Sequence, residues 1–285
     1  MTLYGKAAAC GAGSIINAIS TWKGAAFAID LHTIAEVTLT SHRSGIKGII
    51  EGGGDTHLIE LAVKHTLSHF NVNCGGIVKT MSNIPQASGL KSSSAAANAT
   101  VLATLFAIEE KLQPEDAINI GVDASVEAGV TITGAFDDAA ASYLGGVVVT
   151  DNKKRSIIRR EQIEAEAVVY APAIQAFSKD VNVSRCRLVS PWIADANAMA
   201  ESGDYWHAMT LNGIIYSAAL GFSPEPILAA LEAGAVSASL SGTGPSYVAI
   251  THDDNTKKVA EAWSGLGGKV INTKIDNRGA YRIED

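Results

Sequence analysis

The sequence predicts an α+β protein with two consecutive domains, and three observations support this. The chain has 285 residues, 47% of them hydrophobic and 18% charged, which is enough apolar material for two modest cores and argues against disorder. Apolar runs alternate with helical patterns along the second half, as in α+β proteins. A strongly charged segment, residues 151–160, separates the two halves. We therefore predict domains at residues 1–160 and 161–285.

The first half is predicted to begin with strands and continue with helices that alternate with strands. Residues 1–40 have the pattern of a strand, a Gly/Ala-rich turn at Gly11-Ala12-Gly13 and further strand. Leu58, Leu61 and Leu67 have helical spacing and predict a helix over residues 57–70. Pro114 is typical of a first helical turn. The remaining elements are strands at 75–82 and 145–150 and a helix at 95–111.

The second half is predicted to alternate between the two kinds of element. Its strands are expected at residues 167–170, 247–251 and 269–275, and its helices near 191–220, 224–234 and 256–266.

Charge and cysteine usage narrow the class of protein. The net charge of −7 argues against a general binder of nucleic acid or anionic membranes. Cys10, Cys74 and Cys186 are scattered, odd in number and lack CxxC spacing, which indicates a reducing compartment and no zinc site. We expect no signal peptide and no membrane span. The cysteines thus favour a cytoplasmic protein, and the net charge leaves room for a local pocket that binds a small anion. A small-molecule substrate is expected, with the protein acting as a monomer or homodimer.

A small-residue segment, residues 84–96, is the strongest functional signal. It lies between a predicted strand and an alanine-rich helix, and it contains Gly89, Lys91 and a run of three serines, Ser92 to Ser94. A turn followed by a helix start directs free N–H groups and the positive end of the helix dipole toward one point. Serine hydroxyls can also donate to phosphate or ligate a hard cation. The alternative is a capped helix whose serines only satisfy N–H groups.

Two further segments bear on the chemistry. Residues 239–246 form a second small-residue turn, in which Gly242 and Gly244 permit positive φ; an ordinary tight turn is the alternative. Asp137 and Asp138 lie among small and apolar neighbours, so a metal, lysine or substrate hydroxyl is the expected partner. A helix N-terminus would explain one of these aspartates without a function. Glu127 could supply a second oxygen ligand to Mg²⁺, or lie on a solvated surface.

Three basic side chains have open interpretations. Lys6 precedes the Gly11 segment and is either functional or an edge-strand lysine facing solvent. Arg185 and Arg187, two residues apart, would share a face of an extended segment and could bind a carboxylate, or could be surface residues.

These elements, in this order, resemble the motifs of the GHMP kinases, the family of galactokinase, homoserine kinase and mevalonate kinase. Residues 85–93, Pro-Gln-Ala-Ser-Gly-Leu-Lys-Ser-Ser, resemble its phosphate loop, Pro-x-x-x-Gly-Leu-Gly-Ser-Ser, with Lys91 in place of glycine. Residues 239–246 resemble its C-terminal glycine motif. Asp138 lies where the family places a catalytic aspartate, Glu127 where mevalonate kinases have a Mg²⁺-binding glutamate, and Lys6 resembles the lysine of the first motif.

Within this superfamily the chain is most similar to the archaeal shikimate kinases. Residues 11–19, 23–27, 89–95 and 136–139 carry this resemblance, which spans nearly the whole chain. It implies the two-domain GHMP kinase fold, with a ribosomal protein S5 domain 2-like N-terminal domain and a ferredoxin-like C-terminal domain. It also implies transfer of the γ-phosphoryl group of ATP to the 3-hydroxyl of shikimate, with Mg²⁺.

The resemblance further implies a role for each motif residue. Asp138, with Asp137 as the alternative, would act on the acceptor hydroxyl, with Lys6 as a further catalytic residue. Ser93 and Glu127 would hold Mg²⁺. Shikimate would be bound by Asn17 and by Arg185 or Arg187, with Arg278 as another possible partner of its carboxylate. The residues expected to bind ATP are Pro85, Gln86, Ala87, Ser88, Gly89, Leu90, Lys91, Ser92, Ser93, Ser94, Gly242 and Gly244.

Two rival functions stay open at this stage. Another GHMP small-molecule kinase, chiefly homoserine kinase, shares the Gly-x-Gly-Pro turn, although the homoserine type tends to have asparagine at the position of Asp138. A catalytically inactive ligand sensor on the same fold is the alternative from another class, and the presence of Ser93, Glu127 and Asp138 argues against it.

Overall fold

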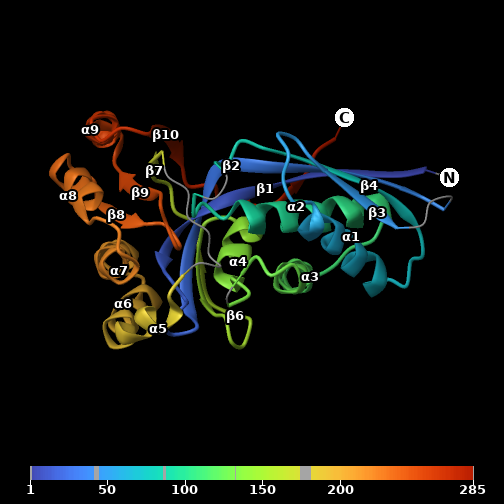
Figure 1. The fold of residues 1–285 in the computed structure, drawn as a ribbon, viewed down its shortest axis with the longest axis horizontal. Coiled ribbons are helices and arrows are strands. Elements are labelled where there is room, and N and C mark those ends of the chain that lie inside the picture. Colours follow the sequence, from blue (N-terminus) through green and yellow to red (C-terminus); the bar gives the residue numbers. More distant parts are fainter. Residues whose placement is uncertain (1, 42–44, 86–87, 132, 174–180, 285) are drawn as a thin grey trace.

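Two β-sheets with helices packed on them organise the chain, and Figure 1 shows the first toward the right and the second toward the left. The computed structural model describes residues 2–41, 45–85, 88–131, 133–173 and 181–284. Among these residues, the first sheet has seven strands and the second has four. This is the mixed α+β architecture in two parts that the sequence predicts.

Two long strands form the centre of the first sheet. They are β1 (Thr2–Ile16) and β2 (Lys23–Thr40), which pair antiparallel along most of their length. One stretch of β2 pairs with β4 (Gly75–Ser82) and the other with β5 (Val147–Asp151). The sheet is completed by β3 (Ile46–Ile50) parallel to β4, β6 (Ser156–Glu161) beside β5, and β11 (Tyr281–Arg282) beside β1.

Four helices belong to this first half: α1 (His57–His69), α2 (Ser92–Ala107), α3 (Pro114–Glu127) and α4 (Phe136–Leu144). The α2 helix packs on β1 and β2, and small residues in β1 allow its close approach. A Cβ atom on Gly5 would lie 2.0 Å from the carbonyl oxygen of Ala103 in α2. Helix and sheet therefore contact each other almost backbone to backbone.

The predicted turn at Gly11-Ala12-Gly13 is wrong, because β1 continues through it to Ile16. Its pairing with β2 shifts register after Cys10 and again after Ser14, which marks irregularities of the kind that β-bulges produce. The glycines there serve packing instead: a Cβ on Gly13 would lie 2.4 Å from the ring of Phe27, and one on Gly11 would lie 3.1 Å from the Leu90 carbonyl oxygen.

The second half has the β-α-β-β-α-β succession of a ferredoxin-like fold. Its sheet has the order β10-β7-β9-β8 and is antiparallel throughout. The strands are β7 (Glu166–Ala171), β8 (Ser237–Leu240), β9 (Tyr247–Thr251) and β10 (Lys269–Lys274). The helices are α5 (Val183–Leu188), α6 (Ser190–Ser202), α7 (Tyr205–Leu220), α8 (Glu225–Glu232) and α9 (Asp253–Ser264).

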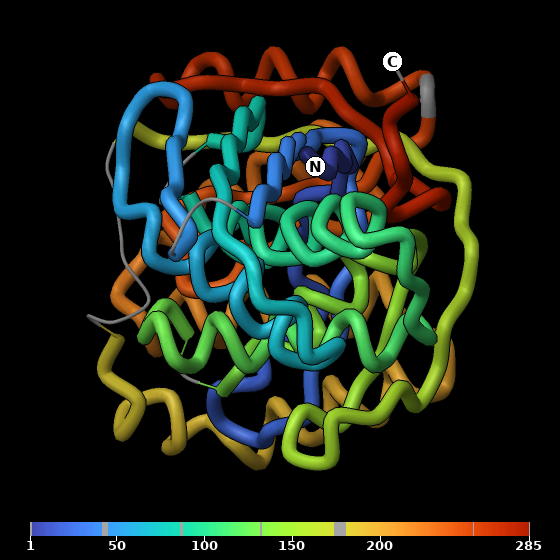
Figure 2. Tube along the Cα trace, turned by 90° about the vertical axis from the view of Figure 1, so that its right-hand side faces the viewer, coloured from blue at the N-terminus to red at the C-terminus, as the bar shows by residue number. Residues whose placement is uncertain are grey.

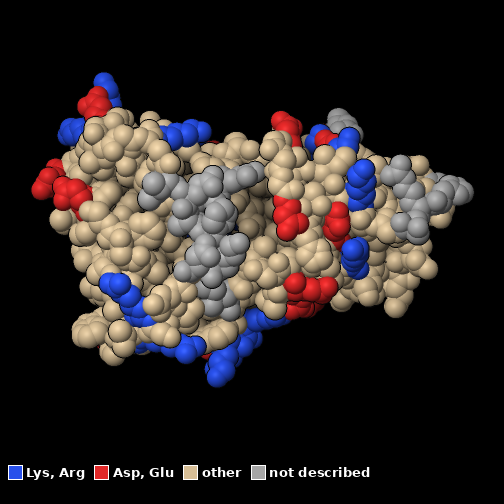
Figure 3. Space-filling view, viewed as in Figure 1, with Lys and Arg blue, Asp and Glu red and all other residues tan. Residues whose placement is uncertain are grey.

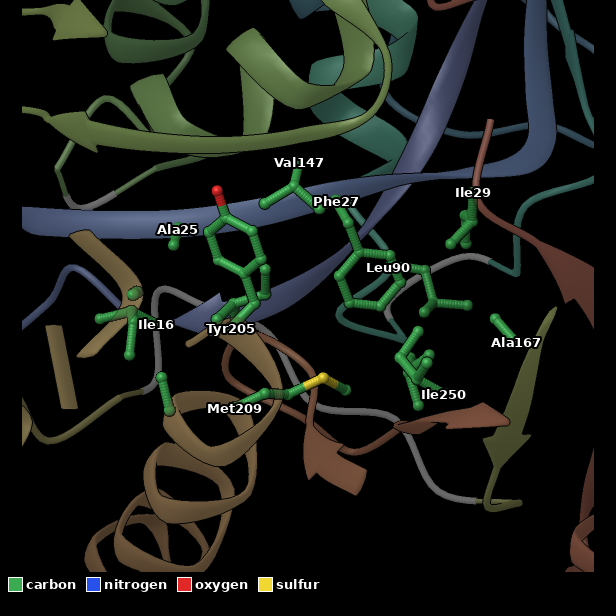
Figure 4. Close-up of a cluster of buried hydrophobic side chains, with 14 of the residues drawn as sticks. Ile16, Ala25, Phe27, Ile29, Leu90, Val147, Ala167, Tyr205, Met209 and Ile250 are labelled. Atoms are coloured by element: carbon green, nitrogen blue, oxygen red, sulfur yellow. The ribbon is translucent and has the colours of Figure 1, made fainter. Parts of the chain in front are cut away.

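The two halves share one hydrophobic core. Figure 4 shows Phe27 and Val147 of the first sheet directed toward Tyr205 and Met209 of α7, with Ile250 of the second sheet in the same cluster. All of these side chains are buried, and the ring of Phe27 also meets that of Trp206 edge-on at 6.2 Å. The halves are thus joined by packing as well as by the chain.

The charged segment at residues 151–160 is largely exposed to solvent, as its composition suggests, but it has regular structure. It forms the β5–β6 hairpin at the edge of the first sheet, and Arg155 and Arg159 make ion pairs with Asp123 and Glu161. Figure 3 shows basic side chains gathered along the lower edge of the face in view, over this hairpin and α5.

The last strand returns to the beginning of the chain. In β11, Tyr281 and Arg282 pair with Ala8 and Ala7 of β1, and Figure 2 shows this final segment near the N-terminus. The first sheet therefore contains residues from both ends of the sequence, and the division at residues 160 and 161 stays a prediction. Over the ranges that the structure describes, the helices are too short or too polar to cross a membrane.

Candidate active site

The small-residue segment forms the loop before α2, and the three serines form the first turn of that helix. The helix begins at Ser92, three residues before the predicted start, so Ser92, Ser93 and Ser94 carry N–H groups without acceptors in their own helix. Upstream, the Ser88 hydroxyl donates to the carbonyl oxygen of Pro85 at 2.6 Å and tightens the loop. Such a helix start favours an anion.

A cavity of about 680 Å³ opens directly on this helix start. Its lining brings together most of the residues that the sequence predicts, contributed by the loop, the acidic pair and the glycine turn. They are Asn17, Ser88, Gly89, Lys91, Ser92, Ser93, Ser94, Asp137, Asp138 and Gly242. Of the other predicted ATP-binding residues, Leu90 is buried in the shared core, Pro85 and Gly244 are outside the lining, and Gln86 and Ala87 lie outside the described residues.

The loop is held in place by the glycine turn of the second half. The Ser241 hydroxyl donates to the Gly89 carbonyl oxygen at 2.9 Å, and the Ser246 N–H donates to the Ser88 carbonyl oxygen at 3.1 Å. A Cβ on Gly89, where φ is +80°, would lie 2.2 Å from the Ser241 carbonyl oxygen, so only glycine allows this approach. The cavity therefore needs both halves of the chain.

Asn17 fixes the same turn from the other side. Its side-chain N–H donates to the Gly242 carbonyl oxygen at 2.8 Å, and its side-chain oxygen accepts from the Ile19 N–H at 3.0 Å. Ser14 contributes as well, because its hydroxyl accepts from the Gly242 N–H at 2.9 Å. The predicted substrate-binding Asn17 lies at the cavity, but these hydrogen bonds also give it a structural role.

The two aspartates lie in the first turn of α4 and face different partners. Asp137 is held by Asn152, whose side-chain N–H donates to its carboxylate at 2.7 Å, and it packs against the backbone of Gly24. Asp138 instead forms an ion pair with Lys91, with 3.0 Å between the lysine nitrogen and a carboxylate oxygen. Both side chains of this pair are about one-tenth exposed.

The environment of Asp137 disfavours its charged form. Desolvation by burial, reinforced by the neighbouring Asp138 carboxylate, raises the pKa of Asp137 to about 7, although Lys91 and the Asn152 hydrogen bond act in the opposite direction. The Asp137 carboxylate is also fixed by Asn152 and packed on Gly24, whereas the Asp138 carboxylate meets the lysine of the phosphate loop. The geometry therefore favours Asp138 as the residue that faces a reacting hydroxyl.

Lys91 links the phosphate loop to the acidic pair. A lysine was one of the partners expected for these aspartates, but the sequence did not identify which lysine. Its backbone has φ of +64° and precedes the first residue of α2, and its side chain crosses to α4. A Cβ on Gly242 would lie 2.6 Å from the lysine nitrogen, so the glycine turn also leaves room for this cation. Asn152 was missed too, because nothing near it in the sequence points to Asp137.

Five other predicted residues do not line the cavity. Lys6 pairs across the strands with Glu36, at 2.8 Å between nitrogen and oxygen. Arg185 and Arg187 lie on the helix α5 and not on an extended segment, so two-residue spacing does not place them on one face. The Glu127 carboxylate lies 2.8 Å from the imidazole of His65. Arg278, the further possibility for the substrate carboxylate, lies over the ring of Tyr281.

Comparisons with known proteins agree with this fold and site. The family of GHMP kinases N terminal domains matches residues 57–146, and the family of GHMP kinases C terminal domains matches residues 193–269. A shikimate kinase from Methanosarcina acetivorans is 54% identical, over 100% of this chain and 98% of that protein.

Solved structures show the same fold at low sequence identity. The homoserine kinase from Cytophaga hutchinsonii superimposes with a TM-score of 0.79 at 19% identity, and the match covers 98% of this chain and 97% of that one. The structure of MDDEF in complex with MVAPP, AMPPCP and magnesium has a TM-score of 0.75 at 15% identity, with both chains fully covered.

These matches show that the chain belongs to the GHMP kinase family, within the group of archaeal shikimate kinases that its motifs resemble. It is therefore an ATP-dependent small-molecule kinase.

Proposed function

We propose that this kinase transfers the γ-phosphoryl group of ATP to the 3-hydroxyl of shikimate, giving shikimate 3-phosphate and ADP on the route to chorismate. The observation that carries the proposal is the identity of 54% to a shikimate kinase over the whole chain. The cavity adds the parts that phosphoryl transfer needs, since it places an anion-binding helix start beside a carboxylate.

Each part of the site has a task in this reaction. The N–H groups at the start of α2 and the Lys91 ammonium would neutralise phosphate oxygens as charge builds up on them. Asp138 would accept the proton of the shikimate hydroxyl as the new P–O bond forms. The docked loops would hold both reactants in line, which is the main source of acceleration in phosphoryl transfer.

The residues at the cavity also suit Mg²⁺, which would supply positive charge to the phosphates when bound. Ser93 is exposed at the start of α2, and hydroxyl and carboxylate oxygens are the ligands that this hard cation prefers. We assign Ser93 as a ligand and keep Glu127 as a prediction, because its carboxylate contacts His65. Ser93→Ala should raise the Mg²⁺ concentration needed for half-maximal rate. The same titration with Glu127→Gln tests the glutamate, and an unchanged midpoint removes the altered residue from the metal site.

The test of the proposed function is ADP release from ATP and Mg²⁺ with shikimate, homoserine and mevalonate supplied separately. We expect release with shikimate alone. Release with homoserine or mevalonate would keep the family and overturn the substrate. ATP binding without release for any acceptor would favour a ligand sensor.

The place of action and the assembly state belong to the same proposal. Cys10, Cys74 and Cys186 are all free thiols, which supports a reducing, cytoplasmic setting. A monomer or homodimer stays the prediction, and sedimentation of the purified chain would decide between them.

A further inference from the structure

Three potential metal ligands from distant parts of the sequence meet at one point of the first sheet. Cys10 lies on β1, His32 on β2, and Asp276 in the turn between β10 and β11. Their ligand atoms all lie within 4.8 Å of one another, and the Cys10 side chain is fully buried. None of the three lines the kinase cavity.

We propose that Cys10, His32 and Asp276 form a binding site for a divalent transition metal ion that accepts thiolate and imidazole ligands, with Zn²⁺ as the best fit. Cysteine sulfur, histidine nitrogen and aspartate oxygen are all ligand atoms of Zn²⁺ in proteins, and three protein ligands with an open fourth position are typical of its catalytic sites. The sequence indicated no zinc site because the cysteines lack CxxC spacing, but the fold brings these ligands together without it.

The observed distances suit a tetrahedral ion. Bonds of about 2.0–2.1 Å from zinc to nitrogen and oxygen, at tetrahedral angles, place those two ligand atoms roughly 3.3 Å apart. The His32 Nε2 atom and the Asp276 Oδ2 atom are 3.2 Å apart in the structure. Cys10 then needs to move its sulfur by no more than a side-chain adjustment, since it is already within the same cluster.

Neighbouring groups orient two of the ligands, as they do in established metal sites. The second imidazole nitrogen of His32, Nδ1, lies 3.6 Å from the Asp30 carboxylate, an arrangement that matches the carboxylate–histidine–metal pattern. The other oxygen of Asp276, Oδ1, accepts from the backbone N–H groups of Arg278 and Gly279 at 2.7 and 2.9 Å. Those bonds leave Oδ2 directed at His32 and available to a metal ion.

The local charge also suits a dication. The carboxylates of Asp30 and Asp276 face Cys10, and Arg278 is the basic group that opposes them. On binding, the Cys10 thiol releases its proton to solvent and the sulfur coordinates as thiolate, so no electron transfer is involved. The Cys10 thiol now donates to the Gly279 carbonyl oxygen at 3.6 Å, a weak contact that a metal bond would replace.

A bound ion would connect three segments that meet only in the folded state. It would tie β1 and β2 to the turn before β11, and so fix the returning C-terminal segment on the first sheet. Because a ligand that binds only the folded chain stabilises it, the effect should appear in thermal unfolding.

The test uses the full chain, stripped with chelator and titrated with Co²⁺ and Zn²⁺. We expect Co²⁺ to produce a near-ultraviolet thiolate charge-transfer band with intense visible bands of tetrahedral cobalt, and Zn²⁺ to displace it and raise the melting temperature. Cys10→Ser should abolish the charge-transfer band. His32→Gln should weaken Zn²⁺ affinity at least about tenfold.

Cys74→Ser is the matched control, since it removes a free thiol that lies elsewhere in the first half. It should keep the band and the stabilisation. Absence of the band in the unaltered chain overturns the proposal, as does a band that survives Cys10→Ser. Circular dichroism of each stripped variant separates a lost ligand from a lost fold.

Discussion

At Lys91 the backbone has φ of +64°, a region that glycine adopts freely and that costs a residue with a Cβ atom about 1–2 kcal/mol. The GHMP phosphate loop usually has glycine at this position, and the structure explains that preference. In this chain a lysine adopts the strained backbone conformation, and its side chain forms the ion pair with Asp138. Strain at a residue that links two functional motifs is typical of an active site.

Comparing the substitutions Lys91→Gly and Lys91→Met should separate the cost of backbone strain from the function of the lysine side chain. Both lose the ion pair with Asp138, but only methionine keeps the strain, so we expect Lys91→Gly to exceed Lys91→Met in free energy of unfolding by about 1 kcal/mol. Urea denaturation measures this difference. Equal stability of the two variants would mean that the backbone at residue 91 is not strained in solution.

Asp138→Asn should lower kcat by roughly 10²–10⁴-fold, the usual contribution of a positioned proton acceptor, while the fold survives. Steady-state ADP release with shikimate measures the loss, and circular dichroism checks the fold. The control is Asp123→Asn, which breaks an exposed ion pair with Arg155 and should leave kcat unchanged. Turnover like that of the unaltered chain in Asp138→Asn would move the role to Asp137.

The raised pKa of Asp137, about 7, makes stability depend on pH in a defined direction. The unfolded chain has the ordinary aspartate pKa of about 4, so between these values the folded chain binds more protons. The contribution of Asp137 to the free energy of unfolding therefore decreases as pH rises from about 4 to 7. Asp137→Asn should remove this decrease, and urea denaturation of both chains at pH 5 and pH 7 measures it. An identical pH dependence in the variant would contradict the shift.

Sequence reasoning located the residues of the site that share a local motif, and it failed where distant residues meet. The loop serines and the acidic pair reach the cavity because a strand, a turn and a helix start fix their direction locally. Lys6 and Glu127 have the expected spacing, but their side chains contact Glu36 and His65. Spacing along one chain does not state which way a side chain points, and so Lys91 was not identified as the partner of Asp138.

Among the contacts between elements, the docking of residues 88–94 on residues 241–246 leaves no room for an added methyl group. Gly89→Ala would place a methyl group 2.2 Å from the Ser241 carbonyl oxygen and force the loops apart. Gly52 has nearly the same φ, +84°, with open space around it, so Gly52→Ala carries the backbone strain alone.

We expect Gly89→Ala to lose about 2 kcal/mol more stability than Gly52→Ala and to weaken ATP binding, because overpacking adds to the shared backbone strain. Urea denaturation and nucleotide titration of the two variants provide the comparison. If both lose the same stability and bind ATP alike, then the loops do not contact each other as described.

Element boundaries were predictable where periodicity is strong. The strands at 75–82 and 247–251 are confirmed, and the helix from His57 ends one residue before the predicted end. The prediction of a turn at Gly11 was wrong because glycine occurs both in turns and where elements pack closely. Only the contacts with Leu90 and Phe27 show that close packing applies here. The short β11 carries too few residues to have a pattern of its own.

At the scale of the whole molecule, the shared core predicts that both halves unfold together. The Trp192, Trp206 and Trp263 side chains belong to the second half, so fluorescence reports mainly on it, whereas far-ultraviolet circular dichroism reports on both. The thermal transitions recorded by fluorescence and by circular dichroism should coincide, because Phe27 and Val147 pack in the same cluster as Tyr205 and Met209. Separate midpoints would show that the halves are independent.

The two-part architecture itself was predictable from the alternation of elements, whereas the contact between the parts was not. The apolar residues of β2 and α7 indicate that each element contributes to a hydrophobic core, but the sequence does not show that both contribute to one core. That information depends on the crossing of β1 and β2 from one half to the other, which Figure 1 shows.

The pairing of β11 with β1 places residues 281–283 beside residues 6–8. The Ile283 N–H donates to the Lys6 carbonyl oxygen at 3.0 Å, so the final residues run along the first strand toward its beginning. A peptide linker from Glu284 to Thr2 would therefore follow the edge of the first sheet and let the chain be opened elsewhere, for example at the open glycines near Gly52. The fold therefore does not depend on the position at which the chain begins, and a circularly permuted chain should adopt the same fold.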